Sequence, residues 1–198
     1  MTLIRQRTLR AAIATLFVPV VFASAMLPLP VVAAPAAATQ AVKPNAAFDK
    51  WADKFAEDWV RLNPQLATST QYFRGAEQAA LDRQLTPITQ AQRAKTRTLA
   101  QQGLVQLNKW MAGPLDETQR TSAAVMRWSL NNVVANEPFE DHTFVFSQFS
   151  GVHVGLVNFM NTTHPLRRAA DVDSYLARLD QIAPRIDEAL VRDRKSVV

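Results

Sequence analysis

The chain has 198 residues, no cysteine, 48% hydrophobic residues and a formal net charge of +5. Without cysteine it has neither disulfides nor thiolate chemistry, so packing must stabilise its fold. Three of the 22 basic residues, Arg5, Arg7 and Arg10, lie near the N-terminus, so 19 basic and 17 acidic residues follow position 38. Because nucleic-acid-binding domains carry a concentrated basic face, we expect no nucleic-acid partner.

Residues 1–38 have the pattern of a secretory signal peptide. A basic start is followed by the uncharged apolar run Ala11–Ala25 and by the Pro- and Ala-rich stretch Leu27–Ala38. A membrane anchor is the alternative, but Pro28 and Pro30 interrupt the apolar run before it reaches the ~20 residues that span a bilayer. We expect export to the periplasm or the exterior, and no stable membrane anchor after cleavage. Retention at the membrane by an uncleaved N-terminus would be recognised by mass spectrometry of the mature N-terminus.

The first helix is predicted from an aromatic stripe that follows a short linker, residues 39–45. Asn63 and Pro64 end this helix, because the residue before a proline avoids helical dihedrals. Pro64 then suits the first position of a second helix that continues to Thr70. The apolar side chains of the first helix recur at spacings of three and four, on one face: Phe48, Trp51, Phe55, Trp59 and Leu62.

The middle of the chain predicts a helical hairpin. Tyr72–Leu85 is interpreted as a loop with one helical turn, and Thr86 as the N-cap of a helix over Pro87–Met111. Gly113 ends that helix, and a second helix over Asp116–Ala135 begins with acidic residues, which the helix dipole favours. We expect the second helix to contribute Ala124, Val125, Trp128, Leu130 and Val133 to the core. The four tryptophans are also expected to be core residues.

The C-terminal part predicts helices around one irregular segment. Phe144–Phe149 is interpreted as an extended, buried segment, because a lone strand would have no partner. A helix over 151–159 ends at His164, and Asp171 or Asp173 caps a last helix that is kinked at Pro184. The fold class expected is all-α, an antiparallel helical array.

The last six residues, 193–198, do not continue the helical pattern. Their codons can spell the start of a widely used short-read sequencing adapter. We therefore expect a non-native tail after residue 192, and the alternative is a natural charged C-terminus. The predicted organisation is a signal peptide (1–38), a linker (39–45), a helical region (46–192) and this tail.

The three histidines do not predict a metal site. His142, His153 and His164 are eleven residues apart, which on an unbroken helix separates neighbours by roughly 16 Å, too far to share one ion. The sequence contains no HExxH, the motif that places two zinc ligands on one helical face. We assign no metal-binding residue.

Two other groupings are weighed against simpler roles. Carboxylates and arginines between 167 and 180 could bind a substrate terminus, but helix caps and surface ion pairs explain them without further assumption: Asp171, Asp173, Asp180, Arg167, Arg168 and Arg178. Ser147 and Ser150 near His153 suggest a nucleophile and base, yet no GxSxG surrounds them. No catalytic or cofactor-binding residue is assigned.

Three stretches together resemble the N-terminal region of the exported bacterial family called domain of unknown function 885. They lie in order between about Phe48 and Leu190 and read FDKWADKFAEDWVRLNPQLATSTQYF, FVFSQFSGVHVGLVNFM and HPLRRAADVDSYLARLDQIAPRIDEAL. The features that carry the resemblance include Pro64, Gln148, Gly151 and the His164-Pro165 pair.

The resemblance implies a mostly helical protein of several hundred residues, similar to zinc-dependent carboxypeptidases and other HExxH metallopeptidases. In such enzymes two histidines and a glutamate hold zinc, and the HExxH glutamate activates water. None of these residues can be assigned here, so we expect an N-terminal fragment that shapes one wall of a substrate cleft, with zinc and a peptide substrate belonging to the full-length form. The fragment is not expected to be active alone.

The alternative is a small, non-enzymatic periplasmic helical protein that binds a partner or peptide. A finished small domain buries its aromatic faces, whereas a fragment exposes a contiguous apolar patch. We expect such a patch along Phe144–Met160 if the chain is a fragment.

Overall fold

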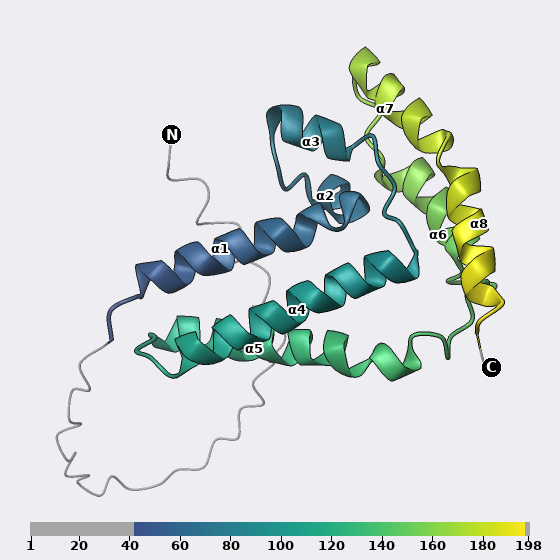
Figure 1. Ribbon diagram of the computed structural model, residues 1–198. Helices are drawn as coiled ribbons and strands as arrows, with labels where there is room; N and C mark the ends of the chain where they lie inside the picture. Colours follow the sequence, from purple (N-terminus) through teal and green to yellow (C-terminus); the bar gives the residue numbers. More distant parts are fainter. Residues whose placement is uncertain (1–41, 197–198) are drawn as a thin grey trace, which may run out of the picture. The chain divides into compact units, whose positions relative to one another are not determined.

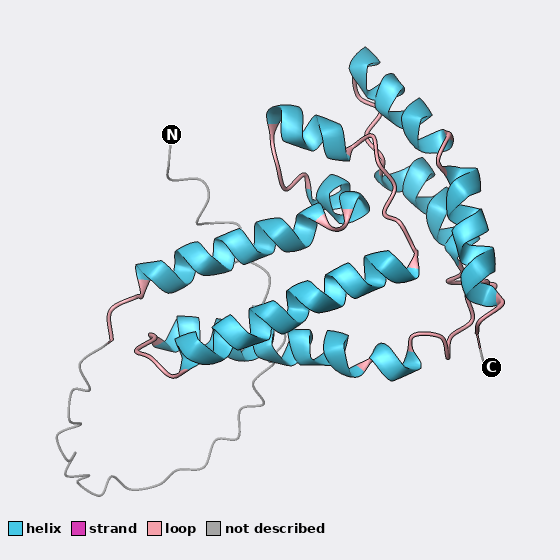
Figure 2. Ribbon diagram, viewed as in Figure 1, coloured by secondary structure: helices cyan, strands magenta, loops and turns pink. Residues whose placement is uncertain are grey.

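The structure is a computed structural model that describes residues 42–196 (Figure 1). The predicted signal peptide, 1–38, lies outside the described residues, as do positions 39–41 of the predicted linker and 197–198. The described residues form helices joined by turns and loops, with no strand among them, as predicted (Figure 2). Within this part of the chain, no helix combines the length and the apolarity needed to cross a membrane.

The N-terminal helices follow the predicted boundaries. Helix α1 is Ala46–Arg61, and the Asn45 side chain caps it by accepting from the first backbone N–H groups. Helix α2 is Pro64–Thr70, with proline at its start as expected. The segment interpreted as a loop with one helical turn contains helix α3, Gly75–Leu81.

The hairpin consists of helices α4, Gln90–Met111, and α5, Glu117–Ala135 (Figure 1). At the start of α5, the Asp116 carboxylate accepts from the backbone N–H of Gln119 at 2.7 Å, and the Gln119 side chain accepts from the backbone N–H of Asp116. This capping box satisfies donors that would otherwise be unpaired at the helix start. The acidic start expected for this helix is confirmed.

The start of α4 was predicted wrongly. The helix begins at Gln90 with Thr89 as its N-cap, three residues later than the expected cap at Thr86. The Thr86 hydroxyl instead donates to the Asn63 side chain at 2.7 Å. A tertiary contact therefore competes with capping for the same hydroxyl, and the chain stays non-helical through Ile88.

The C-terminal part holds five short elements. They are a 3₁₀ turn, η1 (Glu137–Phe139), helix α6 (Val152–Asn158), a π-helical turn, η2 (Phe159–Thr163), and helices α7 (Ala169–Leu179) and α8 (Ile182–Asp193).

Two expectations for this part are corrected. The last helix is two helices, and the break falls at Asp180 and Gln181 rather than at Pro184, which lies in the first turn of α8 where a proline displaces no hydrogen bond. Asp171 lies inside α7 instead of preceding it, and its Oδ2 accepts from the backbone N–H groups of Arg167 and Arg168.

The segment over Phe144–Phe149 consists of turns and bends. Its phenylalanines were expected to be buried, but none of them is. Val145 is 3% exposed, but Phe144 is 70% and Phe149 is 85% exposed. The backbone returns on itself, since the N–H of Val152 donates to the Val145 carbonyl at 3.0 Å. Val145 is thus the buried anchor of this segment, and the aromatic rings flank it at the surface.

The apolar core consists of three separate small clusters of buried residues. One lies between α1, α4 and α5, one joins α1 to α2 and α3, and one joins the loop before α4 to α6, η2 and α8. Their buried members are, in that order, Phe48, Leu107, Leu115 and Ala123; Val60, Ala67, Phe73 and Leu81; and Leu85, Leu156, Phe159 and Met160.

Helix α5 contributes less to the core than expected. Val125 and Trp128, expected to lie inside, are 59% and 68% exposed, and Ala124 is exposed as well. The buried positions of α5 are Gln119, Ala123 and Leu130, so its core stripe is narrow. The prediction that all four tryptophans are core residues is therefore wrong for Trp128.

Candidate functional site

The most deeply buried polar group in the described residues is the guanidinium of Arg178 on α7, which is 0% exposed. Its Nε donates to the Gln84 carbonyl at 3.0 Å, and its Nη2 donates to the Leu81 carbonyl at 3.1 Å and to the Thr68 hydroxyl at 2.6 Å. Its central carbon lies 4.8 Å from the centre of the Phe159 ring. Arg178 therefore joins α7 to α2, to the end of α3 and to η2.

Thr68 connects this buried cation to a carboxylate. Its hydroxyl, which accepts from Arg178, donates to Asp82 Oδ1 at 2.6 Å, and Gln78 donates to the same oxygen at 2.8 Å. Burial lowers the pKa of Arg178 to about 10, and the negative charge of Asp82 opposes that shift. A pKa of about 10 leaves the guanidinium charged at neutral pH.

His164, at the end of the π-helical turn η2, completes the network. The ring is 7% exposed, and its Nδ1 lies 2.6 Å from Nη1 of Arg178. Because a guanidinium can only donate, Nδ1 must accept, which requires the neutral imidazole with its proton on Nε2. Nε2 is buried without a hydrogen-bond partner, and the ring packs edge-on against Tyr175 with centroids 5.3 Å apart.

The environment of His164 opposes a positive charge on its ring. Burial lowers the pKa of His164, and the nearby positive charge of Arg178 lowers it further, while Asp171 and Asp82 act in the opposite direction. The Thr68 hydroxyl and the central cation of the network are both buried away from solvent. What the network does is fasten α7 and η2 to α2 and α3.

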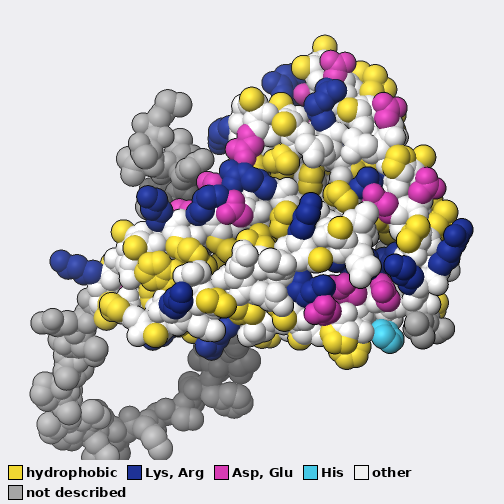
Figure 3. Space-filling view, in the orientation of Figure 1, with side chains coloured by type: hydrophobic (Ala, Val, Ile, Leu, Met, Phe, Trp, Pro, Cys, Tyr) yellow, Lys and Arg dark blue, Asp and Glu magenta, His cyan; other side chains and the backbone are white. Residues whose placement is uncertain are grey.

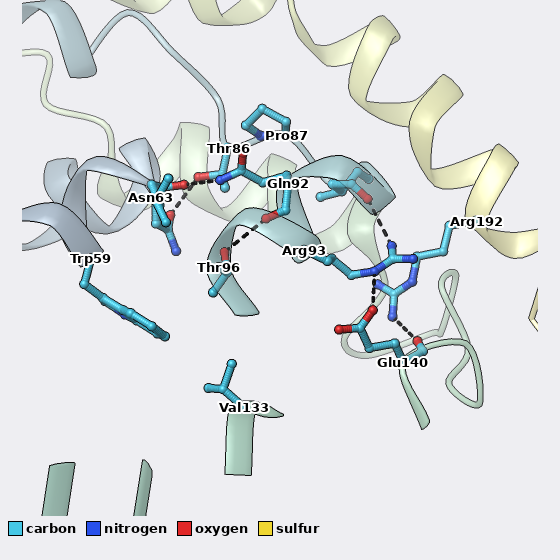
Figure 4. A pocket seen from close by; sticks show the side chains of 12 residues that line it. Trp59, Asn63, Thr86, Pro87, Gln92, Arg93, Thr96, Val133, Glu140 and Arg192 are labelled. Atoms are coloured by element: carbon cyan, nitrogen blue, oxygen red, sulfur yellow. Dashed lines mark hydrogen bonds and ion pairs between the residues drawn. The ribbon is translucent and has the colours of Figure 1, made fainter. Parts of the chain in front are cut away.

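The main candidate for ligand binding is a pocket of about 270 Å³ between the ends of α1 and α5, the start of α4 and helix α8 (Figure 4). Trp59 and Val133 form an apolar wall at one end, and Arg93, Glu140 and Arg192 gather at the other (Figure 4). An apolar wall with a few polar groups is the usual character of a small-ligand site.

Charges at the polar end of this pocket are paired with one another. Arg93 contacts Glu140 at 2.9 Å and Asp141 at 3.3 Å, and Arg97 contacts Glu140 at 3.0 Å. Arg192 donates to the backbone carbonyl of Glu140 at 2.6 Å. These contacts hold the loop after η1 against α4 and α8, so the pocket has a fixed, nearly neutral polar rim.

An open apolar groove of about 360 Å³ runs between α1 and α5. Its lining is almost entirely apolar: Ala52, Phe55, Ala56, Trp59, Val60, Val125, Met126, Ser129, Leu130 and Val133. On the face drawn in Figure 3, apolar side chains gather over α1 and α4. The aromatic stripe of α1 is therefore only half covered, since Trp51, Phe55 and Trp59 all keep intermediate exposure.

The structure does not bring the three histidines together. His142 and His153 are exposed and each packs near a phenylalanine ring, while His164 is buried against Arg178. Among the described residues, no group of three histidine or acidic side chains is arranged to hold a metal ion. The described residues therefore do not fit the zinc site that the resemblance implies for the full-length family.

The serine pair and the charged cluster have local roles. Ser147 and Ser150 lie 2.9 Å apart, oxygen to oxygen, and no hydrogen bond joins either serine to His153 within the described residues. In the cluster around α7, Asp171 accepts from backbone N–H groups at the helix start, which agrees with the predicted capping role. For Arg178 that interpretation was wrong, because this residue is buried instead of forming a surface pair.

A sequence signal for the Arg178 network existed. Asp171, Tyr175 and Arg178 follow one another at spacings of four and three, the pattern of one helical face. Two charged residues on the same face as a tyrosine indicate either a solvated face or a polar face that packs on partners. Deciding between these requires Thr68 and Asp82, more than 90 residues earlier in the chain.

The comparisons with known proteins give one match. The sequence profile described as "Bacterial protein of unknown function (DUF885)" matches residues 64–197. No curated protein and no solved structure matches the chain.

Proposed function

Because the chain belongs to the bacterial protein family of unknown function DUF885, we propose that residues 46–192 are the N-terminal helical region of an exported, metallopeptidase-like protein. In this proposal the helices form one wall of a peptide-binding cleft, and the zinc-binding HExxH part of the protein supplies the catalytic floor. The family match gives membership alone, and the peptidase character and the export are what we propose.

The observation that carries the proposal is the exposure of large apolar side chains after α5. Phe139, Phe144 and Phe149 are 61%, 70% and 85% exposed, and Val157 and Leu166 are more than half exposed. Exposed aromatic side chains at this density are typical of a surface that packs against another part of a protein. Of the segment Phe144–Met160, for which a contiguous patch was predicted, Phe144 and Phe149 are exposed, whereas Leu156, Phe159 and Met160 are buried.

The division of the core supports the same proposal. A domain usually has one contiguous apolar core with smaller satellites, whereas twelve of the buried apolar residues described here divide into three clusters of four. Helices that share so little core gain stability when a further layer covers them. The pocket of Figure 4 fits the role of a cleft wall, since Trp59 can contact an apolar substrate side chain while Arg192 and Glu140 face polar groups of a peptide.

In this proposal, peptide cleavage belongs to the zinc-binding HExxH part of the longer protein, and not to residues 46–192. The described residues hold no set of metal ligands, so the chain supplied with zinc should not hydrolyse peptides. If the chain alone, loaded with zinc and assayed on unstructured oligopeptides, cleaves them at a rate that chelation abolishes, the assignment of catalysis to the HExxH part is wrong.

The exposed face is tested directly by a double variant, Phe144→Glu with Phe149→Glu. If this surface normally packs against another part of the protein, the unmodified chain should bind an apolar fluorescent dye and self-associate at high concentration. The double variant should bind less dye and self-associate less. Val105→Glu is the control for an exposed apolar side chain elsewhere, because Val105 is 56% exposed on α4, where it lines a separate groove with Trp51 and Phe55. Equal dye binding by all three proteins would refute the proposed packing face.

A second candidate is a non-enzymatic helical binding protein, and the apolar groove between α1 and α5 favours it. A partner helix could lay an apolar face in a groove of this kind. Titration of the chain with amphipathic helical peptides, followed by tryptophan fluorescence, separates the two. Saturable micromolar binding that Met126→Glu abolishes, together with a null result for the Phe144 and Phe149 variant, favours the binding protein.

A further inference from the structure

Helix α7 is attached to the rest of the described residues mainly through polar groups. Its buried residues are Asp171 and Arg178, whereas its larger apolar side chains Val172, Leu176 and Leu179 are 45%, 52% and 39% exposed. Tyr175 alone brings apolar surface to the cluster around Leu156. Loss of the hydrogen bonds of Arg178 would therefore leave α7 with little to hold it.

We propose that His164 is a pH-sensitive latch for α7. At neutral pH its neutral imidazole accepts a hydrogen bond from Arg178 and helps to hold the helix against α2 and α3. In acid, protonation of the ring ends that acceptance and releases α7 from its anchor, while the helices of the first two clusters stay folded.

The geometry explains why protonation is disruptive. A protonated ring has N–H groups at both nitrogens, so Nδ1 would face the guanidinium of Arg178, whose nitrogen lies 2.6 Å away, donor to donor and cation to cation. Nε2 carries its proton in both forms of the ring and has no hydrogen-bond partner of normal geometry, and the nearby backbone of Asp171 raises the pKa of His164 by less than burial and Arg178 lower it. In a buried site such a charge repulsion is screened weakly.

The other ionisable groups that face the ring do not offer relief. Asp82, after α3, is engaged by Thr68 and Gln78, and Asp171, on α7, accepts from the backbone N–H groups at the helix start. Tyr175, also on α7, presents its ring edge-on to the imidazole. Both carboxylates raise the pKa of His164, but burial and Arg178 lower it by more.

The sign of the effect follows from the direction of that shift. A histidine whose pKa is lower in the folded state than the ordinary 6.5 binds its proton more readily once released. Stability is therefore complete above pH 6.5, falls as the pH drops from 6.5 toward the folded pKa, and levels below it. Release should be visible in that window.

The test uses the fact that the chain has three histidines, two of which are exposed. Hydrogen exchange of the α7 amides is measured at pH 7.5 and pH 5.5 and corrected for intrinsic exchange rates. Protection of α7 should fall several-fold at the lower pH, by no more than about tenfold, which is the limit for one histidine with a released-state pKa of 6.5, while protection of α4 and α5 stays constant. The matched variants His142→Asn and His153→Asn should show the same pH response as the unmodified chain. His164→Asn should lose that response, because its amide oxygen can accept from Arg178 but does not titrate.

Retention of the full pH response in His164→Asn would overturn the latch. So would an NMR titration of the unmodified chain in which the His164 ring has a pKa equal to or above those of His142 and His153. The titration needs no variant, so the latch remains testable even if His164→Asn does not fold.

Discussion

Replacement of Arg178 by methionine should remove most of the attachment of α7. Methionine has a similar length but donates nothing, so the Leu81 carbonyl, the Thr68 hydroxyl and the His164 ring lose a charged donor in a site that excludes water. Relief of the buried charge offsets part of this loss. Each buried acceptor left without its donor costs about 1–3 kcal/mol of unfolding free energy, and with the relief of the buried charge subtracted we expect a loss of about 3–5 kcal/mol.

Urea unfolding followed by circular dichroism measures this loss. With a denaturant slope of about 2 kcal/mol per molar, which is usual for small proteins in urea, the midpoint should fall by about 2 M. Arg167→Met is the control, since Arg167 is exposed in the loop before α7 and its removal should change stability by less than about 0.5 kcal/mol. Equal midpoints for the two variants would refute the account of Arg178 as the anchor of α7.

Other predictions concern single contacts, each read from the same unfolding curves. Thr68→Val keeps the shape but removes the hydroxyl between Arg178 and Asp82, and should cost about 1–3 kcal/mol, so an unchanged midpoint would deny that link. Asp116→Ala removes the cap of α5 and should cost about 1 kcal/mol, against a smaller loss of about 0.3 kcal/mol for Glu117→Ala, which removes a charge but leaves the cap. Gly151→Ala should cost about 1–3 kcal/mol, because a Cβ there would lie 2.5 Å from the backbone nitrogen of Ser147, which cannot move aside as a side chain can; tolerance would mean that this turn is loosely packed.

The helical class and several helix boundaries could be predicted because local rules decide them. Pro64 cannot continue a preceding helix but suits the first turn of the next, and α2 begins there. Asp116 has an acceptor for the helix start, and α5 begins directly after it. At both helix starts the local cap forms although a distant residue binds the same side chain, since Asn63 also accepts from Thr86 and Gln119 also accepts from the backbone N–H of Asn45.

Long-range contacts decided the positions where prediction failed. The sequence favoured Thr86 as the cap because Pro87 follows it, but the Thr86 hydroxyl binds the Asn63 side chain and Thr89 caps the helix instead. Trp128 is a residue type typical of cores, but α5 packs mainly on α4 and leaves Trp128 exposed. The burial of Arg178 depends on Thr68 and Leu81, which no local pattern connects to it.

Long-read sequencing of the genomic locus across codon 192 and onward tests the central claim most directly. The account predicts that the reading frame continues for several hundred codons and encodes HExxH with a downstream glutamate. The longer product should then cleave peptides in a zinc-dependent manner. A genomic stop codon directly after Val198 would contradict the claim that these helices are the wall of a metallopeptidase-like cleft, and would leave the small binding protein as the working account.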